Sequence, residues 1–236
     1  MPRRRKRNRP EPPRERWDRE LEELKLRLRS YRLDLDQTRK ERLRLYLSHV
    51  YEWSRRIALL SRGDVEHLVW KHIGSSLGPL LVLSPTPGSK WVDIGSGAGL
   101  PGLVLKIWEP SQELHLVESS RKKCIFLEEA RRRLGVGEIP IHTLRVETWL
   151  ERGERIGEFD LLMTRAVANV TNTLRDFGRL VRPGGKVLTF KGPGWLEDLN
   201  AAKERGLIGR GRYRLEQVVR IPWAPGHLLL LRKDGE

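Results

Sequence analysis

The sequence predicts a doubly wound α/β domain preceded by a helical extension. Three observations carry this prediction. Short apolar runs alternate with helix-length segments from residue 90 onward, a glycine-rich turn follows the first apolar run, and the preceding region has helical periodicity. Alternating strands and helices are typical of a parallel sheet with helices on both faces. The 236 residues suffice for one such domain and an added element.

The N-terminal region divides into a tail and a helical part. Residues 1–16 hold eight Arg or Lys, four Pro and, apart from Met1, no large apolar residue, which predicts a disordered basic tail. Leucines and aromatic residues at helical spacing predict helix over 17–62, and a further helix is expected over 64–83 with Asp64 as its N-cap. The expected domains are 1–16 (disordered basic tail), 17–86 (helical region) and 87–236 (cofactor-binding domain).

The C-terminal domain follows a cluster of Pro, Gly and Ser at 84–89, which ends the last N-terminal helix. Strands are expected at 90–94, 114–117, 141–145, 159–163, 186–190, 213–219 and 227–231. Helices are expected from the glycine-rich turn to about 108, and at 121–134, 169–181 and 195–205.

Composition limits the possible partners. The formal net charge of +15 exceeds what solubility needs and favours a polyanion, nucleic acid ahead of an anionic membrane, with an ordinary solvated surface as the alternative. No apolar run is long enough to span a membrane, and the N-terminus lacks the apolar stretch of a signal peptide. Cys124 is the one cysteine, so we expect a buried, inert thiol and a cytoplasmic protein.

A glycine-rich turn, Asp93–Gly102 (DIGSGAGLPG), ends the first predicted strand. Glycines allow a sharp turn and a close approach of a ligand to the backbone, and the next helix presents unpaired N–H groups. Glu118 ends the second predicted strand, where its carboxylate can accept hydrogen bonds from a ribose diol. The pattern therefore predicts a site for a nucleoside cofactor.

Two cofactors fit this turn, and an ordinary tight turn is a third interpretation. Gly97–Gly102 also matches G-x-G-x-x-G, the dinucleotide fingerprint, so an NAD-dependent oxidoreductase remains open. Asp93 favours S-adenosylmethionine (SAM), because a carboxylate suits a cationic, amino-acid-bearing ligand and repels a pyrophosphate. Phe159-Asp160 and the Arg182–Lys186 run (RPGGK) also match the layout of SAM-dependent methyltransferases.

Five segments together resemble the RsmG (GidB) family, whose members use SAM to methylate guanine N7 in 16S ribosomal RNA. They are DIGSGAGLPG, VESSRKKCIFLEEARRRLG, RVETW, FDLLMTRAVA and RPGGKVLTFKG. The resemblance runs from about Trp53 to the C-terminus and is densest over 91–192. It implies a Rossmann-like methyltransferase sheet, SAM as cofactor, and ribosomal RNA or the small ribosomal subunit as partner of a monomeric enzyme.

The resemblance also implies roles for single residues. The cofactor-binding set comprises the turn, the ribose-binding Glu118, two residues beside the adenine and Arg165 near the methyl donor: Asp93, Gly95, Gly97, Gly99, Leu100, Glu118, Val146, Glu147 and Arg165. The RNA-binding set is Arg55, Arg56, His72 and Lys191. The resemblance places Lys191 on the RNA side, whereas Arg55, Arg56 and the tail cations Arg3–Arg7 are candidates because Lys and Arg contact phosphates. Arg165 could instead pair with a surface acid, Glu147 could be a helix-start acid, and Lys191 a solvated cation. Trp53 or Trp195 could stack on a base, with ordinary packing as the alternative.

The sequence departs from the family pattern in two places. Ile57–Leu60 replaces an Asn-Leu-Thr segment, and His72–Leu77 (HIGSSL) lacks the Asp of His-x-Leu-Asp-Ser-Leu. These departures leave a second hypothesis open, in which the chain is an RNA-binding protein that has lost methyl transfer or acts on another RNA. For the leading hypothesis no catalytic base and no metal are expected, since N7 of neutral guanine already carries a lone pair and positioning can supply the catalysis.

Overall fold

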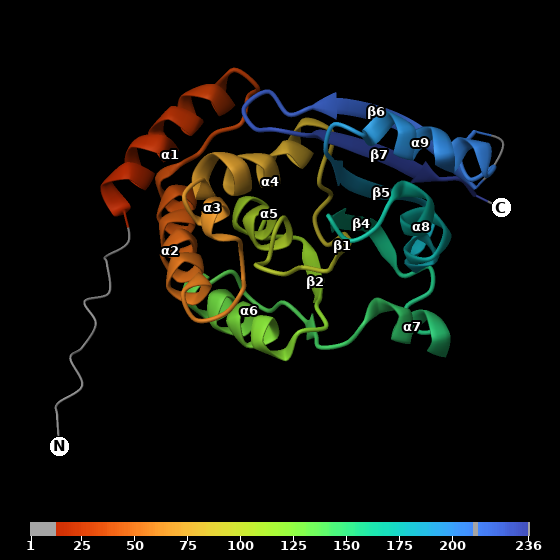
Figure 1. Cartoon of the computed structure of the whole chain (residues 1–236), viewed down its shortest axis with the longest axis horizontal. Helices are drawn as coiled ribbons and strands as arrows, with labels where there is room; N and C mark the ends of the chain where they lie inside the picture. Colours follow the sequence, from red (N-terminus) through yellow and green to blue (C-terminus); the bar gives the residue numbers. More distant parts are fainter. Residues whose placement is uncertain (1–12, 210–211, 236) are drawn as a thin grey trace.

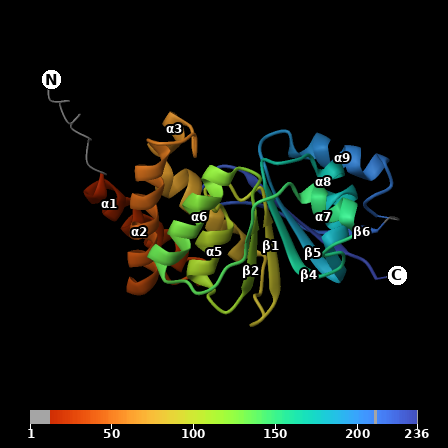
Figure 2. The same cartoon turned by 90° about the horizontal axis from the view of Figure 1, so that it is seen from below.

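The computed structural model describes residues 13–209 and 212–235. Within these residues the chain forms a seven-stranded sheet with helices on both faces (Figures 1 and 2). The strands lie in the order β3-β2-β1-β4-β5-β7-β6. They are β1 (Lys90–Ile94), β2 (Glu113–Val117), β3 (Ile141–His142), β4 (Phe159–Arg165), β5 (Val181–Lys191), β6 (Tyr213–Arg220) and β7 (His227–Lys233).

The first five strands are parallel, as predicted, and the strand order reverses between β1 and β4. β7 differs, because it runs antiparallel to both β5 and β6. The link from β6 to β7 covers only 221–226, and a connection this short returns the chain as a hairpin, since a parallel crossover needs a dozen residues or more. The switch between β1 and β4 is the place where ligands bind in such sheets.

Each face of the sheet carries its own set of helices and its own apolar core (Figure 2). One face carries α1 (Arg14–Arg29), α2 (Gln37–Ser54), α3 (Arg62–Val65), a π-helix (Leu68–Gly74), α4 (Ser75–Leu77), a 3-10 helix (Gly78–Leu81), α5 (Gly102–Trp108) and α6 (Arg121–Leu134). The other face carries α7 (Val146–Arg152), α8 (Val170–Arg175), a 3-10 helix (Phe177–Leu180) and α9 (Trp195–Glu204).

The prediction of helix throughout 17–62 is wrong at 30–36 and at 55–61. Asp36 begins α2 as its N-cap, because its side chain accepts a hydrogen bond from the Arg39 N–H. Residues 14–16, predicted to be disordered, form the first turn of α1, and the buried Trp17 anchors that turn. The rest of the predicted tail, residues 1–12, lies outside the described residues.

The predicted helix over 64–83 is divided into short helices. Ser61, not Asp64, caps the first of them, since its hydroxyl accepts from the Asp64 N–H. Trp223, which follows β6, packs against Gly74 and its indole N–H donates to the Gly74 carbonyl at 2.8 Å. The helical run changes type at Gly74, where it also contacts this distant residue, and local periodicity cannot indicate such a contact.

Several boundaries in the C-terminal domain also differ from the prediction. β3 ends at His142 and the unpredicted helix α7 follows, while the predicted helix 169–181 ends as α8 at Arg175. Cys124 is buried, as expected. In the described part of the chain, no helix combines the length and the apolar character that a membrane crossing requires.

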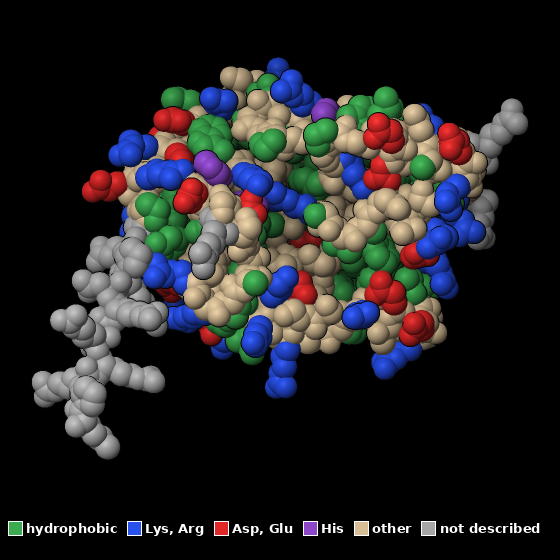
Figure 3. Space-filling view, in the orientation of Figure 1, with side chains coloured by type: hydrophobic (Ala, Val, Ile, Leu, Met, Phe, Trp, Pro, Cys, Tyr) green, Lys and Arg blue, Asp and Glu red, His purple; other side chains and the backbone are tan. Residues whose placement is uncertain are grey.

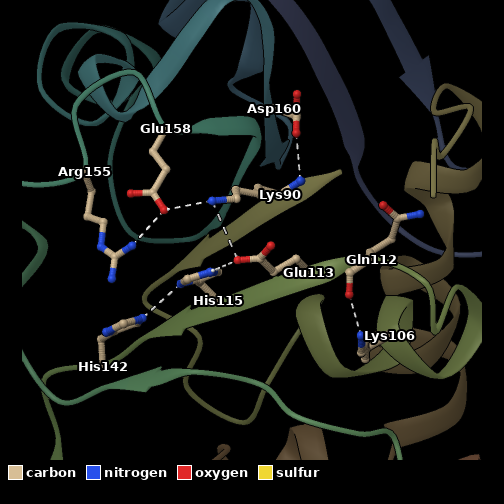
Figure 4. A network of polar contacts seen from close by, with 9 residues as sticks. All are labelled: Lys90, Lys106, Gln112, Glu113, His115, His142, Arg155, Glu158 and Asp160. Carbon is tan, nitrogen blue, oxygen red and sulfur yellow. Dashed lines mark hydrogen bonds and ion pairs between the residues drawn. The ribbon is translucent and has the colours of Figure 1, made fainter. Parts of the chain in front are cut away.

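A polar network ties the sheet together near the start of β1 and β2 (Figure 4). The Lys90 ammonium lies 3.9 Å from Glu113 and 3.4 Å from Glu158. His115 contacts Glu113 through Nε2 and His142 through Nδ1, both at 3.1 Å. Burial is the main cause that lowers the pKa of His142 to about 4, so the two stacked imidazoles do not repel one another at neutral pH.

Candidate cofactor and RNA site

The carboxyl ends of three parallel strands meet at one edge of the sheet. Ile94, the last residue of β1, is paired with Val117 of β2 and with Thr164 of β4. The residues that follow these three are Gly95, Glu118 and Arg165. The strand register therefore brings together the glycine turn and two of the side chains that the sequence assigned to a cofactor.

The glycine turn leaves an open approach to its backbone. Gly95, Gly97 and Gly99 have φ angles of 70°, 55° and 80°, in the left-handed region that favours glycine. A Cβ at Gly95 would lie 2.4 Å from Val167, whereas a Cβ at Gly97 would have only the Gly95 carbonyl within 4 Å, at 3.7 Å. Gly97 is thus the position where a ligand can come close to the chain.

Glu118 joins the turn to the end of β2. Its two carboxylate oxygens accept hydrogen bonds from the Gly97 N–H at 3.0 Å and the Ser120 N–H at 2.8 Å. The residue is 6% exposed, so its position is set by these bonds. Each carboxylate oxygen can accept a second hydrogen bond. Open backbone at Gly97 and a fixed carboxylate beside it suit the nucleoside part of SAM.

Asp93 lies in the interior beneath the turn, away from solvent. It is fully buried, and its Oδ2 accepts a hydrogen bond from the Gly102 N–H at 2.9 Å, which holds the start of α5. Its Oδ1 has no hydrogen-bond partner among the described residues. Burial raises the pKa of Asp93 to about 7, with the Gly102 N–H acting in the opposite direction. This placement argues for support of the turn rather than the direct ligand contact that the sequence suggested.

The remaining turn and adenine-side residues lie around the same edge. Leu100 is 7% exposed, and its N–H donates to the Ser96 carbonyl within the turn. Val146 is buried at the start of α7, and Glu147 is exposed in the first turn of that helix. α7 follows β3, the neighbour of β2, so these two residues follow the strand next to Glu118.

Arg165 and His72, predicted from distant parts of the chain, are in contact. Arg165 Nη2 donates to the Lys71 carbonyl at 3.2 Å and lies 3.3 Å from His72 Nδ1. Its Nη1 is buried without a partner among the described residues. Burial and then the Arg165 charge lower the pKa of His72 to about 4, against the opposing effect of Asp64. Arg165 therefore links the end of β4 to the π-helix of the N-terminal region.

The predicted RNA contacts differ in their surroundings. Arg55 and Arg56 are exposed at the end of α2, as an RNA contact requires. Lys191 instead forms an ion pair with Asp198 of α9 at 2.6 Å and donates to the Ala168 carbonyl at 3.0 Å. Its side chain is 11% exposed, so these bonds argue for a structural role at the end of β5.

The two tryptophans considered for base stacking are engaged in packing. The Trp53 indole N–H donates to Glu129 at 3.1 Å, and its ring lies edge-on to Phe126. The Trp195 ring lies 5.3 Å from the His227 ring.

Sequence reasoning missed Tyr46 of α2. Its hydroxyl donates to the Ala98 carbonyl in the glycine turn at 2.6 Å, and the residue is 2% exposed. Helical spacing indicates that Tyr46 belongs to the apolar face of α2. Nothing in the spacing indicates which carbonyl its hydroxyl reaches, because Ala98 lies far along the chain.

Solved structures share this fold at low sequence identity. MtNAS in complex with MTA and tNA has a TM-score of 0.56 at 19% identity, covering 84% of this chain and 74% of that one. The ribosomal protein L11 methylase from Lactobacillus delbrueckii subsp. bulgaricus has a TM-score of 0.52 at 13% identity, covering 69% and 77%. The fold and its cofactor edge, together with a match of residues 39–213 to a methyltransferase family, define the class: the chain is a SAM-dependent methyltransferase.

Sequence comparison identifies the family within that class. The family described as rRNA small subunit methyltransferase G (GidB) matches residues 39–213. Proteins named ribosomal RNA small subunit methyltransferase G include those of Moorella thermoacetica (38% identity; 66% of this chain, 65% of that protein), Halorhodospira halophila (34%; 75% and 80%) and Ruegeria sp. (31%; 86% and 96%). This chain belongs to the rRNA small subunit methyltransferase G family.

Proposed function

We propose that this protein transfers the methyl group of SAM to N7 of a guanine in small-subunit ribosomal RNA. The observation that supports this most is the edge where Glu118 and Arg165 follow strands in register with β1, and where Glu118 accepts from the open backbone of Gly97. The names of the relatives support ribosomal RNA as the substrate.

The residues around the turn would hold the cofactor. Glu118 would accept hydrogen bonds from the ribose hydroxyls, and Gly97 would allow the nucleoside to approach the backbone. Val146 and Glu147, at the start of α7, would flank the adenine. Bound SAM supplies a methyl group on a positively charged sulfur, which a nucleophile with a free lone pair can attack.

The groups near the edge favour a nucleophile that needs no deprotonation. Asp93 is buried beneath the turn, and His72 has a lowered pKa and an Nδ1 in contact with Arg165. Neither is placed to take a proton from a substrate. N7 of neutral guanine has a free lone pair, so rate enhancement can come from orientation of the reactants, which supplies on the order of 7–11 kcal/mol in favourable cases.

Methyl transfer from labelled SAM to small-subunit ribosomal RNA tests this function. Free RNA and assembled small subunits are offered separately, and modified guanines are located by chain cleavage at 7-methylguanine. We expect label at N7 of a guanine and a strong loss of transfer in Glu118→Ala, with Glu204→Ala, at an exposed acid that ends α9, as the matched control.

Two results would contradict the proposal. Binding of both RNA and SAM without transfer would indicate an RNA-binding protein that has lost the activity. Calorimetric binding of NAD without binding of SAM would indicate an oxidoreductase. We also propose that the protein is a monomer and that it acts in the cytoplasm. Sedimentation at increasing protein concentration tests the oligomeric state.

A further inference from the structure

The carboxyl edge of the sheet continues past Arg165 into a cleft of about 620 Å³. The cleft is lined by the ends of β4, β5 and β6, the start of β7 and the π-helix. In the strand register Lys191 of β5 is paired with His227 of β7, which is paired with Arg220 of β6. Three basic residues thus stand side by side on neighbouring strands, next to Arg165.

The described lining of this cleft is basic. It includes Lys71, Arg165, Lys191, Arg220 and His227, and no Asp or Glu. Two of these cations are already balanced, because Lys71 pairs with Asp64 and Lys191 pairs with Asp198. Arg220 is exposed, and no acidic side chain among the described residues lies within ion-pair distance of it. Arg220 is therefore the cation in this group that is best placed to meet an external anion.

The remaining lining is largely apolar. Phe190 is half-buried, Ile221 is buried, and Pro193 and Pro225 complete this part of the wall. The space-filling view shows that this face of the molecule is hollowed near its middle, with hydrophobic and charged side chains around the hollow (Figure 3). An apolar wall with a cationic rim matches a nucleotide, whose base is apolar on its faces and whose phosphate is negatively charged.

We propose that this cleft binds the target nucleotide of the RNA, with the base against the wall around Phe190 and a flanking phosphate on Arg220. The inference rests on the proposed function and adds a substrate site to it. Arg165 and Ala166 line the cleft and also belong to the edge that carries Gly95 and Glu118. A base in this cleft would therefore lie next to the cofactor crevice. Reaching it requires a nucleotide that is unpaired or turned out of a helix.

Arg220→Gln tests the phosphate contact, with Arg214→Gln as the matched control. Both residues are exposed on β6, but Arg214 pairs with Asp234 and does not line the cleft. Fluorescence anisotropy measures binding of a labelled single-stranded RNA containing one guanine, over a series of salt concentrations. For Arg220→Gln we expect binding about fivefold weaker and a log–log salt slope reduced by about 0.7, the value for one phosphate contact. Arg214→Gln should bind as the wild type does, and the SAM dissociation constant should be unchanged in both variants.

Phe190→Leu tests the position of the base and keeps an apolar side chain in place. The wild type should bind the guanine-containing RNA more tightly than the same RNA with an abasic site. We expect Phe190→Leu to reduce this preference, while its melting temperature reports any loss of folding. The proposal would be overturned if Arg220→Gln and Arg214→Gln bound the RNA with equal affinity. It would also be overturned if the wild type bound the intact and the abasic RNA with equal affinity.

These measurements do not depend on methyl transfer. A wild type without transfer activity whose RNA affinity still depends on Arg220 would contradict the proposed function and leave the cleft supported. If the wild type transfers the methyl group and Arg220→Gln binds RNA as tightly as the wild type, only the proposal of nucleotide binding in the cleft is contradicted.

Discussion

Gly97 and Gly137 show how one backbone constraint can have different consequences. Their φ angles are 55° and 79°, so a branched residue is strained at either position, by roughly 1–2 kcal/mol. Among the described residues, no atom lies within 4 Å of a Cβ at Gly137, a loop position, whereas Gly97 belongs to the cofactor turn and donates to Glu118. We expect Gly97→Val to abolish SAM binding and Gly137→Val to retain it, as measured by calorimetry. Equal SAM affinity of the two variants would show that the nucleoside does not approach Gly97.

Asp93 predicts a pH dependence of stability. Its pKa in the folded protein is raised to about 7, above the ordinary value of 3.8, so the folded state binds the proton more tightly than the unfolded state. The stability that this group contributes is fully present below about pH 4 and is lost as the pH rises through 7. We expect the free energy of unfolding of the wild type, relative to Asp93→Asn, to fall between pH 5 and pH 8 in urea titrations. A difference that is constant over this range would contradict a protonated Asp93.

At the scale of elements, α2 supports the glycine turn from the N-terminal region. The Tyr46 hydroxyl binds the Ala98 carbonyl, and both residues are almost fully buried. Tyr46→Phe leaves that carbonyl without a partner, so we expect the free energy of unfolding to fall by about 1–3 kcal/mol and SAM to bind several-fold more weakly.

Tyr51→Phe is the matched control for this change. Tyr51 lies on the same helix, and among the described residues its hydroxyl has a hydrogen bond only with the exposed Arg55, at 3.4 Å. The free energy of unfolding of Tyr51→Phe, from urea titration, and its SAM affinity, from calorimetry, should be close to those of the wild type. A Tyr46→Phe variant that is destabilised but binds SAM normally would show that α2 stabilises the fold without holding the turn.

The elements that local patterns predicted best are those whose structure depends on nearby residues. β1, the glycine turn and α6 follow from apolar spacing and from turn residues, and the structure has them at the expected places. The segment 55–81 was predicted less well, because its short helices depend on distant contacts such as that of Trp223 with Gly74. The strand predicted at 227–231 is present as β7, but its antiparallel direction was not predicted, because apolar alternation is the same in either strand direction.

At the scale of the whole molecule, the N-terminal helices and the sheet share one apolar core, which includes Leu21 of α1, Leu47 of α2 and Trp91 of β1. The helical region is therefore part of the same packed unit as the cofactor edge. The hydrogen bonds of Tyr46 with the turn and of Lys71 with Arg165 connect the helical region to the site itself.

The net charge of +15 predicts how the two ligands respond to salt. RNA binding releases counterions, so its affinity should fall with salt with a log–log slope of about −0.7 for each phosphate contacted by a single-stranded substrate. SAM has no phosphate and should bind with little dependence on salt. Anisotropy with RNA and calorimetry with SAM over the same salt range measure both. RNA affinity that is independent of salt would rule out the basic surface as the binding determinant.

The sequence by itself predicted the fold class and a nucleoside site, because a strand, its glycine turn and an acid after the next strand are local signals. The resemblance of five segments then indicated the family and its cofactor. The tertiary structure decided which of the predicted residues are free to act. Asp93 is buried beneath the turn, Lys191 is held by Asp198, and Arg220 lies open beside the cleft. Each of these depends on contacts between residues far apart in the chain, and spacing along a sequence carries no information about such contacts.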